Sequence, residues 1–434
     1  MYSVPYSHTH LEFDLPPGMR GTVVESKHAP PIADLPAAVE AALADPIETP
    51  PLTELARPGD KVCIVFTDAT RDSPDALVVP PVLRALEQAG VRDEDITLLC
   101  GIGMHRASTP EEKLAKLGQA VLDRFGRLSS AVIDNEPQNP DALVDLGVVH
   151  DIPLSVHRAA YEADLLIATG IVEPHQYAGY SGGPKTVAVG AAGEPLIAYS
   201  HGPHFVDDPN VRLGQIEGNP FQEALQEAAS RAGLRFIVNA VLDDESRAVA
   251  LMAGAPGPTH TRLVTFARSI YEVPVAQQYD VAIGGVGYPK DANLYQATRA
   301  ASYLYFGLRP VLRPGGCFIV PARCEEGAGE GVGEQRFLRA MSEAPDVATV
   351  LADGRKHGYP PGQQRAFVMA KVLEHHPVIF AATEHPEVVA ACKMIPAPTI
   401  EAALAMAAEA FGSDLDVLIV PHALRTLPIV TSET

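Results

Sequence analysis

The sequence contains no tryptophan, and its five cysteines are scattered without a CxxC pair. This pattern argues against a cysteine-based zinc site and favours reduced thiols. No uncharged apolar run is long enough to span a membrane, and Glu12 and Asp14 interrupt the region where a signal peptide would have its apolar core. We therefore expect a cytoplasmic protein that does not enter a membrane.

Positive charge is also scarce. The 33 lysines and arginines against 54 aspartates and glutamates give a net charge of 33 − 54 = −21. Because nucleic acids bind to basic faces, this balance argues against a nucleic-acid partner, although a local basic pocket for a small anion remains compatible with it. At 434 residues and 47% hydrophobic content, the chain is expected to form two packed globular domains.

The apolar pattern predicts an α/β fold. Short apolar runs that alternate with helical patterns are typical of buried parallel strands. The capping box Thr109-Pro-Glu-Glu112 and the Asn219-Pro pair mark two helix starts, and a further helix is expected through Ala402–Phe411. The predicted strands are Lys61–Phe66, Ile96–Cys100, Leu165–Thr169, Phe236–Val241, Asp280–Gly284, Cys317–Val320 and Asp416–Val420.

The segment Ala253–His260 is rich in proline and glycine, which makes it a candidate hinge. We predict an N-terminal α/β domain over residues 1–265 that binds a cofactor. A C-terminal α/β domain over residues 266–434 is expected to complete the substrate site. Each domain should contain a largely parallel sheet flanked by helices, with the active site in the cleft between them.

Polar residues follow four of the predicted strands. These segments are Asp68–Arg71, Gly101–Arg106 with His105, Glu173–His175 and Tyr288–Asp291. In open α/β sheets, ligands bind beyond the carboxyl ends of the strands. The four loops are therefore expected to meet at one site between the domains.

The stretch Glu173–Lys185 combines a histidine, three glycines and a lysine. Glycines let backbone N–H groups approach a phosphate closely, so this loop is a candidate site for a small anionic cofactor. The sequence from Gly179 to Thr186 nearly matches a P-loop. However, Pro184 stands where the second glycine should be, and proline lacks both the N–H and the required backbone freedom. A nucleotide triphosphatase is therefore disfavoured.

Two further histidines, His201 and His204, lie in Ser-His-Gly-Pro-His. Histidine is a common ligand for zinc, nickel or iron. The intervening Gly-Pro disfavours a regular helical presentation of both rings to one metal. We interpret His204 as an ordinary surface histidine.

Several of these pieces, in their order and spacing, resemble the family of nickel-pincer lactate racemases and related 2-hydroxyacid racemases and epimerases. The resemblance runs from the Asp68 loop to about Gly331. The matching pieces are Asp68-Ala-Thr-Arg71, Gly103-Met-His105-Arg106, Glu173-Pro-His175 with Gly179–Lys185, His201, Tyr288–Gln296 and Glu325–Gly331.

The resemblance implies a role for each piece. Lys185 would hold a nickel-bound pyridinium-3,5-bisthiocarboxylic acid mononucleotide covalently, and His201 would bind its nickel. His105 and His175 would be the acid–base residues, and Arg71 would orient the substrate oxygen. The residues implied to bind the cofactor and its phosphate are Asp68, Thr70, Ser181, Gly182 and Gly183, and those implied at the substrate are Tyr295, Gln296 and Arg299. Proteins that synthesise the cofactor would be partners.

The implied chemistry explains these residue types. Inverting C2 of a 2-hydroxy acid by proton removal would create an unstable carbanion, whereas moving the hydrogen as hydride to the pyridinium avoids it. The hydroxyl proton leaves to a base of near-neutral pKa, which suits histidine, and a 2-keto acid forms between the two transfers. Sulfur, carbon and imidazole ligands suit square-planar nickel.

Two departures bear on the substrate. Arg299 stands where the resemblance predicts a lysine, and a planar guanidinium binds a carboxylate differently from a point charge. The resemblance also implies a tryptophan at the methyl pocket of lactate-specific members, and this chain has none. A larger or differently shaped substrate than lactate is expected.

Two other functions remain open at this stage. A divalent-metal hydrolase could use His105, His175 and His201 with Asp68, but it would not need Lys185. Alternatively, the chain could bind carboxylates or sugar acids without catalysis, although the retained histidines and lysine argue against that reading.

Overall fold

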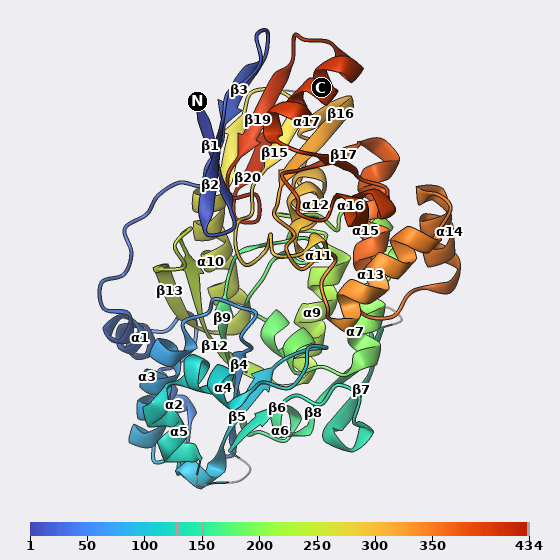
Figure 1. Ribbon diagram of the computed structural model, residues 1–434. Helices are drawn as coiled ribbons and strands as arrows, with labels where there is room; N and C mark the ends of the chain where they lie inside the picture. Colours follow the sequence, from blue (N-terminus) through green and yellow to red (C-terminus); the bar gives the residue numbers. More distant parts are fainter. Residues whose placement is uncertain (127, 129–130, 150–151, 432–434) are drawn as a thin grey trace.

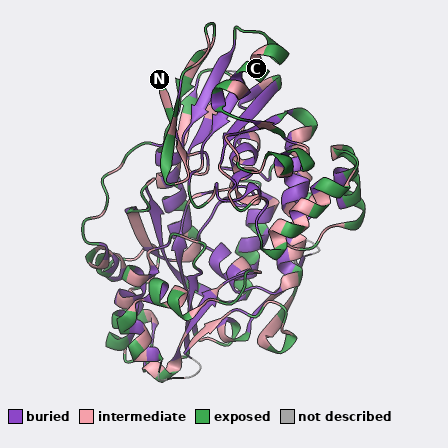
Figure 2. Ribbon diagram, in the orientation of Figure 1, coloured by how far each residue is buried: buried purple, intermediate pink, exposed green. Residues whose placement is uncertain are grey.

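The computed structural model describes residues 1–126, 128, 131–149 and 152–431 (Figure 1). Two six-stranded sheets form the centres of two α/β units, as the apolar pattern predicts. Most residues of both sheets are buried, and exposed residues lie mainly on the outer helices and loops (Figure 2). Within the part of the chain that is described, no helix combines the length and apolar character that crossing a bilayer requires.

The first sheet is parallel except for one edge strand. Its order is β13 (Ala248–Gly254), β12 (Leu234–Leu242), β9 (Leu165–Ile171), β4 (Val62–Thr67), β5 (Ile96–Gly101) and β6 (Val132–Asp134), with β13 antiparallel. All six residues of β4 are buried because helices cover both faces. This explains why β4, β5, β9 and β12 read as continuous apolar runs in the sequence.

The two faces of this sheet carry different helices. One face packs against α1 (Leu35–Ala44), α2 (Leu52–Leu55), α3 (Asp75–Gln88), α4 (Pro110–Leu117) and α5 (Gln119–Phe125). The other face packs against α6 (Arg158–Tyr161), α7 (Glu194–Ser200), α8 (Pro203–Asp207), α9 (Pro220–Arg231) and a hairpin of β7 (Leu143–Val149) and β8 (Ile152–His157). The second face points towards the C-terminal unit, and its core continues into that unit.

The second sheet is wholly parallel. Its order is β18 (Ile395–Ala397), β17 (Val378–Ala381), β16 (Leu312–Pro321), β15 (Tyr279–Gly284), β19 (Asp416–Val420) and β3 (Arg20–Val23). One face packs against α17 (Ile400–Phe411) and the hairpin of β1 (Tyr2–Tyr6) and β2 (Thr9–Phe13). The face towards the N-terminal unit carries α12 (Arg299–Tyr305), α13 (Val332–Glu343), α14 (Val347–His357), α15 (Gln364–His375) and α16 (Pro386–Ala391).

The N-terminal segment belongs structurally to the second sheet, which the sequence reading did not anticipate. Figure 1 shows β1 to β3, in blue, beside the yellow to red strands of the C-terminal unit. β3 pairs with β19, and Nε of Arg20 donates to Oδ1 of Asp416 across the pair at 2.8 Å. Residues near the start of the chain therefore complete a sheet formed otherwise by residues after 278.

The expected hinge over residues 253–260 is wrong. β13 ends at Gly254, and α10 (Pro256–Tyr271) begins at the following prolines and packs on β12 and β13. Proline suits the first turn of a helix as well as a loop, so the same residues fit both readings. Residue 265 lies inside α10, and the predicted division there stays a prediction. A short strand, β14 (Glu272–Val275), pairs with β20 (Leu427–Val430) beyond this helix.

Candidate active site

A cavity of about 1230 Å³ lies between the two units. Loops after β4, β5, β6 and β9 line one side, and α11 (Leu294–Ala297), α12, α13 and the start of α15 line the other. The structure brings together on its wall every residue predicted for the site except Gly183. The residues that line it are Asp68, Thr70, Arg71, His105, His175, Ser181, Gly182, Lys185, His201, Tyr295, Gln296 and Arg299.

One of the four predicted loops does not line the cavity. Tyr288 is 51% exposed and packs its ring on His8, while Asp291 accepts a hydrogen bond from the backbone N–H of Ser7. This loop joins the β1–β2 hairpin to the C-terminal sheet. It was expected at the site because its polar residues follow the predicted strand Asp280–Gly284.

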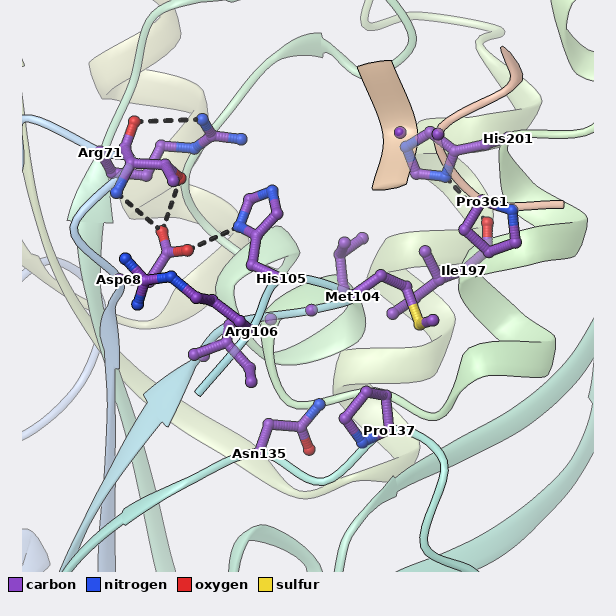
Figure 3. A pocket seen from close by; sticks show the side chains of 18 of the residues that line it. Asp68, Arg71, Met104, His105, Arg106, Asn135, Pro137, Ile197, His201 and Pro361 are labelled. Carbon is purple, nitrogen blue, oxygen red and sulfur yellow. Dashed lines mark hydrogen bonds and ion pairs between the residues drawn. The ribbon is translucent and has the colours of Figure 1, made fainter. Parts of the chain in front are cut away.

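Asp68 and His105 form a hydrogen-bonded pair at the ends of β4 and β5 (Figure 3). Nδ1–H of His105 donates to Oδ2 of Asp68 at 2.6 Å, and the Thr70 hydroxyl donates to Oδ1 at 2.7 Å. Burial raises the pKa of Asp68, but the bonds to His105 and Thr70 outweigh it, so the net pKa is lowered and the carboxylate stays ionised. With Nδ1 as donor, Nε2 of His105 is left as a proton acceptor.

A buried hydrogen-bond network supports this loop, and no pattern in the sequence predicted it. The Lys116 amine donates to the carbonyl oxygens of Arg71 at 2.6 Å and Ser73 at 3.1 Å, and it pairs with the Asp75 carboxylate at 3.3 Å. Asp75 is fully buried and also accepts from the hydroxyls of Thr67 and Thr169. Lys116 therefore fixes the backbone that carries Asp68 and Arg71.

His175 has the opposite hydrogen-bonding pattern to His105. It lies in β10 (Pro174–His175), which turns sharply into β11 (Gly179–Tyr180). Its Nδ1 accepts from the backbone N–H groups of Tyr177 at 3.3 Å and Ala178 at 3.1 Å. The neutral ring therefore carries its proton on Nε2. Burial, followed by the positive charge of Lys185, lowers the pKa of His175 well below its usual value.

Lys185 follows the glycine loop and precedes a buried π-helical turn, Thr186–Gly190. Its side chain is buried, and its amine makes no hydrogen bond or ion pair within the residues that the structure describes. Burial, and then the nearby Arg71, lower the pKa of this amine to about 7. A large fraction of Lys185 is therefore a neutral nucleophile near pH 7, which is the form that acylation requires.

The glycine loop is held by the protein itself. Gly183 has φ +53°, a Cβ there would lie 2.7 Å from the His260 ring, and its N–H donates to Asn239 at 2.7 Å. The Ser181 hydroxyl donates to the carbonyl of Ile171 at 2.8 Å. Gly183 thus shapes the loop from outside the cavity, while Ser181 and Gly182 remain on its wall.

His201 presents one ring nitrogen to the cavity. It follows α7, and its Nδ1–H donates to the carbonyl of Ile197 at 2.9 Å, which leaves Nε2 unprotonated (Figure 3). Burial lowers the pKa of His201 to about 4, so the ring is neutral near pH 7. His204 is exposed, does not line the cavity and packs on Tyr199 and Phe205, which agrees with its interpretation as an ordinary surface histidine.

These donors fit the implied nickel cofactor better than a metal held by protein alone. Over the described ranges, no cluster of three His, Cys, Asp or Glu side chains could hold a metal ion. A single imidazole Nε2 suits a metal that brings its other ligands with it, and the unpaired Lys185 amine suits a covalent link. The same observation counts against the divalent-metal hydrolase.

Other cavity residues had no signal in the sequence. The Tyr359 hydroxyl donates to the carbonyl of His201 at 3.0 Å, and Gln176 and Arg365 reach the wall from the turn after β10 and from α15. The larger aromatic residues of the wall are tyrosines. Tyr295 and Gln296 are presented by α11, whose Asn293 cap accepts from the Gln296 N–H at 3.0 Å.

Comparisons with known proteins give a consistent result. The family model described as the lactate racemase N-terminal domain matches residues 6–214, and the lactate racemase C-terminal domain matches residues 275–427. A lactate racemase of Thermoanaerobacterium thermosaccharolyticum is 28% identical over 98% of both chains. A lactate racemase of Lactiplantibacillus plantarum is 30% identical over 90% of both chains.

Solved structures agree. The lactate racemase apoprotein of T. thermosaccharolyticum superposes with a TM-score of 0.86 and 29% identity, over 98% of this chain and 99% of that one. A Thermotoga maritima protein superposes with a TM-score of 0.64 at 19% identity, over 92% of this chain and 97% of that one. The second likeness concerns the fold alone.

Proposed function

The chain belongs to the lactate racemase family and is an isomerase, and on that premise we propose that it inverts C2 of a 2-hydroxy acid with a nickel-pincer nucleotide attached to Lys185. The observation that carries the proposal is the combination in one cavity of an unpaired, largely neutral lysine, a free imidazole Nε2 on His201 and two histidines. The names of the relatives add lactate as a candidate substrate.

The chain's own residues would divide the work as follows. Lys185 forms the covalent link, His201 binds nickel through Nε2, and the wall near Asp68, Thr70, Ser181 and Gly182 contacts the nucleotide. When bound, this cofactor supplies an electron-poor pyridinium carbon that accepts the C2 hydrogen as hydride.

We assign the handling of the substrate's hydroxyl proton to the two histidines, His105 and His175. Nε2 of His105 accepts the hydroxyl proton, and the ionised Asp68 stabilises the imidazolium that results. The 2-keto acid would then turn and regain the C2 hydrogen on its other face; Nε2–H of His175 would donate a hydrogen bond to the oxygen from that side, and the proton held by His105 would return to the oxygen. Arg71 orients the oxygen, while Gln296 and Arg299 hold the carboxylate.

The experiment is mass spectrometry of the intact protein after coexpression with the cofactor-making enzymes. We expect an added mass on Lys185 together with nickel. Lys185→Ala should lose both, His201→Ala should keep the adduct but lose nickel, and Lys290→Met, a lysine that does not line the cavity, should keep both.

The loaded protein is then assayed with a chiral panel of 2-hydroxy acids in D₂O. Inversion without deuterium at C2 is expected, because hydride does not exchange with solvent. Deuterium at C2 would point to proton abstraction instead. A loaded protein that inverts no member of the panel would contradict the proposed function, and inversion that survives in Lys185→Ala would show that the reaction does not need a cofactor attached to this lysine.

A further inference from the structure

Two guanidinium groups on the C-terminal wall of the cavity have no counter-ion. Arg299 begins α12, and Arg365 lies in the first turn of α15. Neither forms an ion pair with any described residue, and the Nε of each is buried without a hydrogen-bond partner. Arg365 is only 7% exposed; its Nη1 donates to Ser302 Oγ at 3.0 Å and Gln176 Oε1 at 3.5 Å, and its guanidinium lies over the Tyr295 ring, 5.8 Å from the ring centre.

Among the described residues, none of the carboxylates that line the cavity forms an ion pair with either arginine. Asp68 accepts from His105 and Thr70, and Glu112 accepts from Arg106. Burial lowers the pKa of Arg299, and the like charges of Arg365 and Arg71 lower it further, so the arginines repel one another. A buried charge without a partner is unfavourable, so these groups fit a ligand that brings negative charge.

Neighbouring amides extend the same donor surface. Gln176 is 3% exposed, and because its Oε1 accepts from Arg365 and Ser302, the amide orientation is fixed. Its Nε2 donor is left without a partner. Donors without partners therefore stand on the turn after β10, on α12 and on α15, all on the cavity wall.

A single carboxylate can neutralise only one of the two guanidiniums. Because each planar fork matches a carboxylate in two-point geometry, two forks fit two carboxylates. We propose that the substrate is a 2-hydroxy dicarboxylic acid, with the carboxylate next to C2 bound at Arg299 and Gln296 and the distal carboxylate bound at Arg365 and Gln176. This inference rests on the proposed function and names its substrate class.

The cofactor phosphate is the other anion that could reach this wall. Lys185 and the glycine loop belong to the N-terminal wall of the cavity, whereas Arg299 and Arg365 are carried by α12 and α15 on the C-terminal wall. We therefore assign the cofactor phosphate to the glycine-loop side of the cavity, and the experiment distinguishes this assignment from binding at Arg365.

The first measurement compares kcat/KM of the loaded enzyme for lactate, malate, 2-hydroxyglutarate and the distal monoamide of malate. We expect at least one dicarboxylate to exceed both lactate and the monoamide by about 100-fold or more, because a site built to pair a charge rejects an analogue without it. Arg365→Met should abolish that preference, and Arg365→Lys should keep part of it. Arg355→Met removes an arginine that pairs with Asp207 outside the cavity and should leave the preference intact.

The second measurement needs no cofactor. Calorimetric titration of the apoprotein should show tighter binding of the preferred dicarboxylate than of lactate, and Arg365→Met should remove the difference. Circular dichroism and thermal melting establish that each variant is folded.

The outcomes separate the two proposals. Lactate turned over as well as every dicarboxylate would overturn the inference while leaving the proposed function standing. Failure to invert any 2-hydroxy acid by the loaded protein would overturn the function itself. If Arg365→Met fails to take up the cofactor but still folds, Arg365 belongs to the phosphate and the inference is wrong.

Discussion

The two walls of the cavity differ in whether their charged side chains are paired with an opposite charge. On the wall formed by the N-terminal sheet, Asp68 is bonded to His105, and Asp75 behind it is bonded to Lys116. On the facing wall, Arg299 and Arg365 are buried without carboxylate partners. The paired charge of Asp68 fixes the orientation of His105, which handles the proton. The unpaired charges of Arg299 and Arg365 can instead pair with negative groups of a bound ligand.

The largest effect is expected from breaking the buried pair behind the first wall. Lys116→Met leaves the Asp75 carboxylate buried without its cation and should lower the free energy of unfolding by about 3–5 kcal/mol. Chemical denaturation of the apoprotein measures it. Lys113→Met, on the same helix, removes a less buried pair with Asp134 and should cost about 1 kcal/mol or less. Equal losses in both variants would remove the special role given to Lys116.

A second prediction concerns the catalytic pair itself. Asp68→Asn removes the charge that holds Nδ1–H of His105 and stabilises its protonated form, so kcat should fall by about 10²–10³-fold with a stable fold. Steady-state racemisation by the loaded enzyme measures this. Asp72→Asn, in the same loop but paired with Arg425 away from the cavity, should retain near-normal turnover. Normal turnover in Asp68→Asn would mean that His105 acts without the carboxylate.

Removing an unpaired charge should raise the free energy of unfolding rather than lower it. Lys185 has a folded pKa of about 7 against 10.5 unfolded, so the unfolded chain binds more protons between these values and stability rises with pH across the window. Lys185→Met should therefore stabilise the apoprotein by a few kcal/mol below pH 7 and by little near pH 10.5. Melting temperatures of both proteins at pH 6.5 and 9.5 test it. A variant that is destabilised at both pH values would show that the amine is paired after all.

The smallest effect is expected at Tyr359. Its hydroxyl donates to the backbone carbonyl of His201, and Tyr359→Phe removes that single bond without emptying the wall. Stability should fall by about 1 kcal/mol, and the loaded protein should keep its nickel. Thermal melting and metal analysis measure the two quantities. Loss of nickel would give Tyr359 a larger part in placing His201 than the contact implies.

The sequence was informative where one local pattern had one structural solution. Continuous apolar runs such as Val62–Thr67 identify strands because both faces are buried, and polar residues directly after them mark the site. Asp68, His105 and His175 were predicted in this way, and all three line the cavity.

Where tertiary packing determines the surroundings of a residue, the local sequence pattern did not predict them. Arg365 precedes the buried stretch Ala366–Ala370, and only the packing of α15 beside the cavity shows that this charged side chain lines the site. β3 is short and partly polar, and its pairing with β19 depends on residues far along the chain. Lys116 looked like one of several charges on a surface helix, and only the fold shows that its amine is buried.

The pairing of β3 with β19 also sets an order of assembly. Asp416, which bonds to Arg20, is added 396 residues later. At ordinary ribosomal speeds β3 therefore waits on the order of 20–80 s for its neighbour. The sheet of the N-terminal unit is complete by Gly254 and is free to form during that wait, whereas the C-terminal sheet closes only when almost the whole chain has been made. A strand made among the first is thus among the last to find its place in a sheet.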